Sequence, residues 1–323
     1  MASVISSLTS KSDVIMHVLS FLNPSELAIL ERTNKALQEA ARRSWQDQCI
    51  IQGIILLATP DGITHRQIFK DLYPGIFGAQ FYKDYLGNVG CVPPIPEKFI
   101  EMAHCPDPLG NPGETIKSNY QLMLIPAFIT ITVGNDSSLT LDEKGKLVKA
   151  EIRNKLPSFE KTLEIPVTLN NLAMLAKRAL RRGNQTSFFK GLSWCNIFQQ
   201  HGDKPVRESR WSYQKKVVVG RGQPYNEQKN FAEGARLEIV SLIERVLFNL
   251  LTYISSQNCP DDEYVVRTST PTLDSHVPPK PWQSIVWWPT SGPSARLGLT
   301  RDNFGDNAVG VAVGVPSGSY SGH

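Results

Sequence analysis

Cysteine is scarce in this sequence, with five residues in a chain of 323. They are odd in number and far apart: Cys49, Cys91, Cys105, Cys195 and Cys259. A disulfide scaffold needs more cysteine in a shorter chain, so we exclude that class of protein. The pattern indicates free thiols in a reducing compartment.

Long hydrophobic runs are absent as well. No segment approaches the ~18–20 consecutive apolar residues that a membrane-spanning helix needs. The opening residues, MASVISSLTSKSD, lack the basic start and apolar core of a secretory signal peptide. We therefore expect a soluble protein of the cytoplasm with no membrane partner. Secretion into the cytoplasm of a host cell, by a route that leaves no N-terminal signal peptide, is the alternative.

Charge of one sign is not in marked excess, because 34 basic and 30 acidic residues leave a net charge of +4. One basic cluster, AKRALRR with Lys177, Arg178, Arg181 and Arg182, lies at the end of a predicted helix, where the helix dipole favours positive charge. An acidic partner or a phosphate backbone is the functional alternative. No aromatic residues interleave with the cluster, so nucleic acid is not an expected partner.

The composition that is present is typical of a globular protein, at 41% hydrophobic and 20% charged residues. We predict an α+β fold in four parts. A small helical unit covers 1–48 and a helical connector covers 49–112. A mixed α+β body with a long central helix covers 113–267, and a Pro/Gly-rich segment over 268–323 contributes strands that pack on the body.

Short patterns predict the elements of the connector and the tail. ITHRQIFKDLYPG, FGAQFYKDYLG and PEKFIEMA are amphipathic pieces separated by proline and glycine, which predicts three short helices. In the tail, WQSIVWWP and NAVGVAVGV carry the apolar content of strands. Trp287 and Trp288 of the first tail pattern could form a recognition surface, but we favour core packing for them.

Longer patterns predict the elements of the body. NYQLMLIPAFITITV is a buried strand broken at Pro126, SSLTLDEKGKLVK is a hairpin with a turn at 143–145, and QKKVVVGRG is a strand and a turn. TLNNLAMLAKRALRRG is a helix that Thr168 caps and Gly183 ends. Residues 231–256 carry a wide apolar face and predict one long helix at the centre of the core.

Metal and nucleophile motifs are missing. Cys91, His104 and Cys105 form the closest Cys/His grouping, but no Cys-x-x-Cys pair accompanies them, so we expect no metal site. Cys195 and His201 would lie nearly two turns apart on a helix, and apolar neighbours favour a buried structural cysteine over a catalytic pair.

Phosphate-loop and hydrolase motifs are missing too. No Gly-x-Ser-x-Gly elbow or P-loop is present. VVVGRGQPY contains Gly-x-Gly, but Pro224 and Tyr225 stand where a third glycine and a helix start belong, so we expect a simple turn. We therefore predict no cofactor and no enzyme.

The opening of the chain carries stronger signals. Residues 13–22 place apolar side chains at helical spacing. The next helix begins with NPSE, where Asn23 can cap, Pro24 suits the first helical position and Glu26 completes a capping box. An apolar stripe then runs to Trp45, with a break or bend expected at Thr33 and Asn34.

This opening resembles the F-box, an adaptor module of cullin–RING ubiquitin ligases. The matching residues are Asp13, Val14, Ile15, Val18, Leu19, Phe21, Leu22, Pro24, Glu26, Leu27, Leu30, Asn34, Lys35 and Trp45. Two features depart from the family pattern: Ser10 and Lys11 replace a Leu-Pro pair, and Leu37 replaces a common aromatic residue. The match covers about 35 of the 323 residues.

The resemblance implies a partner and a contact surface. In the family, apolar residues of the first helix and turn bind a Skp-type linker protein, which here implies Val14, Val18, Leu19, Leu22, Pro24 and Leu27. A docking helix needs more apolar positions than its own small core can hide. The alternative is that these residues only pack the opening helices onto the body.

The rest of the chain is similar to the bodies of F-box-bearing proteins from chlamydia-like bacteria that live in amoebae. The resemblance rests on FGAQFYKDYLGNVGCVPPIPEKF, YQLMLIPAFITITV and the Gly/Val-rich C-terminus. It implies a bacterial effector that uses a eukaryotic adaptor module to present an unknown target protein. An enzyme of unknown chemistry and a purely structural interaction protein are the alternatives.

Overall fold

The computed structural model describes twelve stretches of the chain: residues 18–19, 22–33, 35–56, 62–72, 75–134, 139–149, 160–181, 196–256, 265–273, 281–287, 296–300 and 309–315. They form a mixed α+β fold, which confirms the predicted fold class. None of the helices in these stretches is long and apolar enough to cross a membrane.

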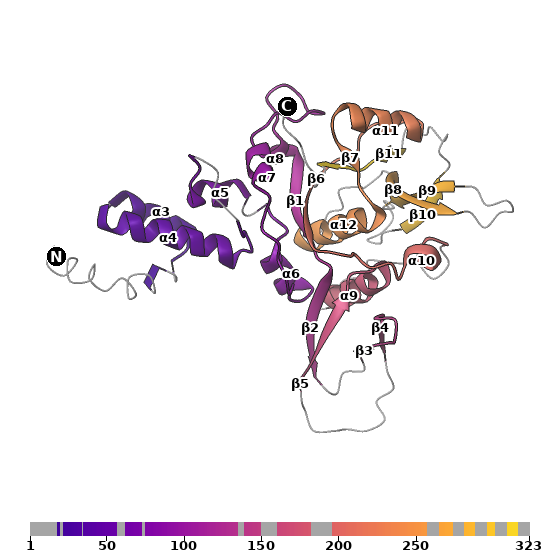
Figure 1. Ribbon diagram of the computed structural model, residues 1–323, viewed down its shortest axis with the longest axis horizontal. Helices are drawn as coiled ribbons and strands as arrows, with labels where there is room; N and C mark the ends of the chain where they lie inside the picture. Colours follow the sequence, from indigo (N-terminus) through magenta and orange to yellow (C-terminus); the bar gives the residue numbers. More distant parts are fainter. Residues whose placement is uncertain are drawn as a thin grey trace.

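The N-terminal helices stand to one side of the body (Figure 1). They are α3 (Pro24–Thr33), α4 (Lys35–Ile51) and α5 (His65–Leu72). The change of helix between Thr33 and Lys35 agrees with the break expected from the sequence. Most of the predicted first helix, 13–22, lies outside the described residues. We refer to α3, α4 and α5 together as the N-terminal unit.

The three amphipathic pieces predicted for the connector form α5 and the next two helices along the chain, whereas a further helix at 116–119 was not predicted. Three short helices connect this unit to the body. They are α6 (Ala79–Tyr85), α7 (Glu97–Met102) and α8 (Ile116–Asn119). The segment after α4 is bonded directly to the segment before α7, because the N–H of Ile95 donates to the carbonyl of Ile55 at 2.6 Å.

The main antiparallel sheet has the strand order β1-β6-β12-β7. Its members are β1 (Tyr120–Ile125), β6 (Arg210–Lys215), β12 (Val313–Val315) and β7 (Glu238–Ile239). The second sheet has the order β10-β9-β8-β11, from β10 (Arg296–Thr300), β9 (Pro281–Trp287), β8 (Val265–Leu273) and β11 (Val309–Val311). The tail therefore supplies strands to both sheets.

Two smaller antiparallel pairs complete the strands. β2 (Phe128–Gly134) pairs with β5 (Glu160–Pro166), and β3 (Leu139–Leu141) pairs with β4 (Leu147–Lys149) around the predicted turn. The separation of β1 from β2 at Pro126 confirms the predicted break, because proline cannot donate to a ladder.

Four helices pack among the strands. They are α9 (Leu169–Arg181), α10 (Asn196–His201), α11 (Tyr225–Gly234) and α12 (Leu242–Ser256). Thr168 caps α9, because its Oγ1 accepts the N–H of Asn171 at 3.1 Å. The end of that predicted helix, with Arg182 and Gly183, lies outside the described residues.

Two sequence predictions are wrong. Residues 231–256 do not form one helix: α11 ends at Gly234, Arg236 adopts a left-handed backbone (φ 55°), and β7 pairs with β12 before α12 begins. The apolar residues of 231–256 recur on both sides of this break, because the strand and the helix both bury their apolar side chains in the same core. The predicted strand at 217–219 is also largely absent, since the ladder of β6 ends at Lys215 and only Val219 pairs again, in an isolated bridge with Val311.

Candidate functional site

The start of α3 is set by hydrogen bonds that the NPSE motif predicted. The Oδ1 of Asn23 accepts the N–H groups of Ser25 (2.9 Å) and Glu26 (3.0 Å). In return, Oε2 of Glu26 accepts the N–H of Asn23 at 2.8 Å. This reciprocal capping satisfies donors that a helix start leaves unpaired. It confirms the predicted cap and sets where α3 begins.

A small aromatic core holds the N-terminal unit together. Leu27 of α3, Trp45 of α4 and Phe69 of α5 are all buried, and the two rings lie 5.5 Å apart. The guanidinium of Arg66 lies 5.9 Å from the centre of the Trp45 ring. Arg66 also pairs with Glu31 of α3 at 2.6 Å. Packing and one ion pair thus join α5 to both other helices.

The six residues implied as linker contacts do not share one environment. Val18 is 55% exposed, and Leu22 and Pro24 are half-buried. Leu19 and Leu27 are buried, at 3% and 0% exposure, and belong to the apolar core. Val14 lies outside the described residues. The prediction that this set binds a linker stays a prediction, with Val18 as its most accessible described member.

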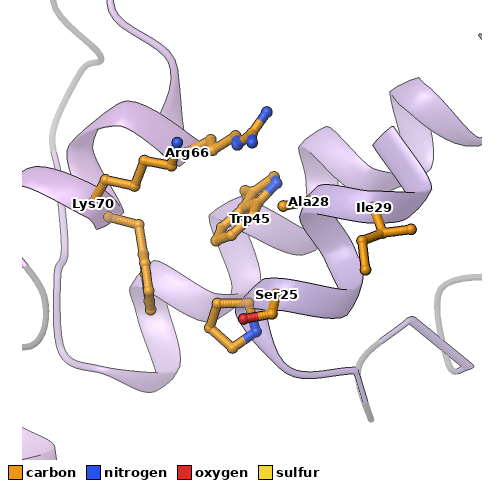
Figure 2. Close-up of a pocket in the computed structure, with 8 residues that line it drawn as sticks. Ser25, Ala28, Ile29, Trp45, Arg66 and Lys70 are labelled. Carbon is orange, nitrogen blue, oxygen red and sulfur yellow. The ribbon is translucent and has the colours of Figure 1, made fainter. Parts of the chain in front are cut away.

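A groove beside these residues was not anticipated from the sequence. It has a volume of about 520 Å³ and is lined by Pro24, Ser25, Ala28, Ile29, Trp45, Arg66, Phe69 and Lys70. Figure 2 shows the Trp45 indole between Arg66 and Lys70 of α5 on one side and the α3 residues on the other. We call this depression the α3–α5 groove.

The exposed apolar residue of the α3–α5 groove is Ile29, which is 63% exposed. A signal for it was available in the sequence. Ser25, Ala28 and Ile29 follow one another at three- and four-residue spacing, so they share one face of α3. The buried Leu27 lies on a different face of the same helix. The predicted linker contacts included the buried Leu27 and did not include Ile29.

The joint between the unit and the body centres on a buried carboxylate. Asp71 of α5 accepts hydrogen bonds from Lys117 Nζ (2.8 Å) and Gln67 Nε2 (3.0 Å), and it bonds His104 Nε2 (2.8 Å). Burial alone would raise the pKa of Asp71, but the hydrogen bonds from Lys117, Gln67 and His104 outweigh it and lower that pKa. Nε2 of His104 is therefore occupied by its hydrogen bond to Asp71.

The predicted absence of a Cys/His metal site is compatible with these contacts. Cys91 and Cys105 are exposed free thiols. Across the part of the chain that the structure describes, no group of three His, Cys, Asp or Glu side chains could hold a metal ion. Cys195, the imagined partner of His201, lies outside that part.

The Gly-x-Gly segment differs from the sequence expectation in one respect. Gly220 and Gly222 adopt left-handed backbone conformations (φ 63° and 75°), as a turn requires. A helix nevertheless begins at Tyr225, directly after Pro224. The buried Arg267 bonds the carbonyl of Gln223 at 3.0 Å, so a buried side chain of the body holds the backbone just before this helix.

Charged groups inside the body form a second buried network. Asp107 and Lys215 make an ion pair in which both side chains are almost fully inaccessible. Asn119 Nδ2 (2.7 Å) and the Tyr120 hydroxyl (3.2 Å) donate to the same carboxylate. Burial tends to raise the pKa of Asp107, but the hydrogen bonds from Lys215, Asn119 and the Leu109 N–H, together with the Lys215 charge, lower that pKa overall. Because both side chains are buried and paired with each other, we assign this pair a structural role.

Comparison with known proteins adds no relative. No family model, no curated protein and no solved structure matches the chain.

Proposed function

We propose that this chain is an F-box-type protein-binding adaptor. In this proposal the N-terminal helices dock a Skp-type linker of a cullin–RING ubiquitin ligase, and the α+β body presents a target protein. The resemblance of the body to proteins of amoeba-dwelling bacteria extends the proposal to an effector that acts in a eukaryotic host.

One observation carries the proposal. The N-terminal unit stands to one side of the body (Figure 1), and it exposes Ile29 beside a groove with an apolar floor. A soluble protein gains nothing for its own stability by leaving a large aliphatic side chain 63% exposed. A groove with an apolar floor is one of the recurring receptors for an amphipathic helix of another protein.

The mechanism of such an adaptor is proximity. A target held by the body would be kept close to the ligase that the linker recruits, which raises its local concentration there. No catalytic group in this chain is required. The linker-binding surface of the unit and the target-binding surface of the body would lie on opposite sides of the joint at Asp71. The joint must therefore hold the unit and the body in a fixed relative position.

The test is co-purification with a eukaryotic Skp-type linker. We expect stoichiometric binding of the wild type and loss of binding in Val18→Asp and in Ile29→Asp, because a carboxylate at an apolar contact is left desolvated and unpaired. Val217→Asp is the matched control, since Val217 lies in the body and is exposed by 54% against 55% for Val18.

Two outcomes would count against this function. A folded wild type that fails to bind the linker would leave the resemblance without a partner. Equal binding by the wild type and both N-terminal variants would place any linker contact elsewhere. Leu19→Asp and Leu27→Asp are poor probes, because both leucines are buried and a carboxylate there would unfold the unit.

A further inference from the structure

One wall of the α3–α5 groove lies outside the stretch that resembles an F-box. That stretch ends at Trp45, whereas α5 supplies Arg66, Phe69 and Lys70 to the lining of the groove. Figure 2 shows Arg66 and Lys70 on the α5 side, across the Trp45 indole from the α3 residues. The resemblance assigns no role to this wall, so its own side chains must indicate what it contacts.

The floor and the α3 side of the groove are apolar. Trp45 and Phe69 are buried, at 2% and 3% exposure, and Pro24 and Ala28 complete the lining beside them. Ile29 is the exposed aliphatic side chain of the lining. A depression of about 520 Å³ with such a floor suits the apolar side of an amphipathic helix.

The charged groups of the lining have one sign. Arg66 and Lys70 are cationic, and none of the residues that line the groove is acidic. Glu31 compensates Arg66 at 2.6 Å, and the neighbouring Asp71 pairs with Lys117 at 2.8 Å. Within the described stretches of the chain, no carboxylate pairs with the exposed Lys70. The α5 side of the groove therefore carries an uncompensated positive charge.

Two N–H donors in the lining have no acceptor. Trp45 Nε1 and Arg66 Nε are buried, and neither has a hydrogen-bond partner in the part of the chain that the structure describes. Nearly all buried polar groups of native proteins are paired, so such orphans require an explanation. Both belong to residues that line the groove. This indicates an occupant that brings hydrogen-bond acceptors.

We infer that the α3–α5 groove takes an amphipathic helix of the linker that carries a carboxylate beside its apolar face, and that Lys70 selects for this carboxylate. The inference rests on the proposed function and names the chemistry of the partner surface. The apolar face packs on Trp45 and against Ile29, while the carboxylate faces Lys70. Charges at the rim of an interface govern specificity and association rate more than affinity, so Lys70 is a specificity-determining residue.

The test is the affinity of the full chain for a eukaryotic Skp-type linker, measured at low and at high sodium chloride. At low salt, Lys70→Gln is expected to weaken binding about threefold and Lys70→Glu about tenfold. Both differences should shrink at high salt, because salt screens exposed charges. Lys83→Glu is the matched control, since Lys83 is also an exposed lysine in the last turn of a short helix. It should bind like the wild type.

A charge exchange identifies the partner group. Acidic residues on the surface of the linker are changed to lysine one at a time. One of these linker variants is expected to bind Lys70→Glu more tightly than it binds the wild-type chain. A merely structural role of Lys70 would not produce that reversal.

The possible failures are distinguishable. A folded wild type that does not bind the linker overturns the proposed function and this inference with it. A wild type that binds, while Lys70→Glu is weakened no more than Lys83→Glu, overturns this inference alone. The same holds if no linker variant reverses the preference. Self-association of the wild type that Ile29→Asp abolishes also overturns it, because a second copy of the chain is then the occupant.

Discussion

The N-terminal unit and the body bury their charged residues differently. In the unit, Glu39, Arg42 and Arg43 of α4 form ion pairs whose side chains are mostly exposed, and the buried carboxylate of Asp71 lies where the unit meets the body. In the body, Lys215 and Arg245 are buried, and Arg245 Nη1 donates to the carbonyl of Lys215 at 3.1 Å. Exposed pairs contribute little to stability, whereas a buried charge without its partner is costly. The ion pairs that matter for stability therefore lie inside the body and at the joint, and the exposed pairs of α4 contribute little.

Breaking the buried pair of the body should produce the largest effect. Asp107→Ala leaves the Lys215 ammonium buried without its counter-charge, which is expected to cost about 3–5 kcal/mol in urea unfolding. Adding Lys215→Met should recover part of that loss, since the buried charge is then gone. A single variant that unfolds like the wild type would show that the body does not depend on this network.

Within the N-terminal unit, substitutions in its own core should lower stability the most. Leu27→Ala removes a fully buried side chain beside Trp45 and is expected to cost about 2–5 kcal/mol. Ile29→Ala, two residues away on the same helix, should change stability by less than about 0.5 kcal/mol, because surface changes usually do. Urea denaturation of each variant beside the wild type measures both costs. Similar stability costs for Leu27→Ala and Ile29→Ala would show that Leu27 and Ile29 do not differ as core residue and docking residue.

The joint tests whether the two regions are coupled. Asp71→Asn removes the charge that Lys117 and His104 share, and hydrogen bonds to charged groups are worth about 1.5–3 kcal/mol each. We expect the thermal transition to move down, with the unit separating from the body. Asp47→Asn, at an exposed position of α4, is the matched control. An unchanged transition would mean that apolar contacts alone hold the joint.

Acid should weaken the same joint. The pKa of Asp71 in the folded protein is lowered from its ordinary value of 3.8. A carboxylate whose pKa is lowered by folding stabilises the protein above its unfolded pKa, and this contribution is lost as pH falls from about 4 through the folded value. Hydrogen exchange at α5 against pH measures it. Asp71→Asn should show a flatter response in that window.

The smallest effects should be alike in both regions. Asn23→Ala removes the cap of α3 and Thr168→Ala removes the cap of α9, and each is expected to cost about 0.5–2 kcal/mol. Thermal unfolding measures both variants. Capping involves only neighbouring residues, so the surrounding region should matter little. A cost at Thr168 far above that at Asn23 would show that Thr168 has a further role in the body.

Much of the fold was predictable because local signals act over a few residues. The cap at Asn23, the break at Pro126 and the turn after Leu141 all appeared where the sequence placed them. The candidate site was only partly predictable. The sequence pointed to the opening helices as the docking region, but it did not separate Leu27, which is buried, from Ile29, which is exposed.

What the sequence determined by itself were helix starts, strand breaks and the α+β class, because hydrogen bonds between near neighbours and the geometry of proline decide them. The tertiary structure alone decided that Arg236 and β7 interrupt the stretch 231–256. It also decided that Ile29 and Lys70, 41 positions apart in the numbering, line one groove. Burial and convergence depend on contacts between distant residues, which no local pattern encodes.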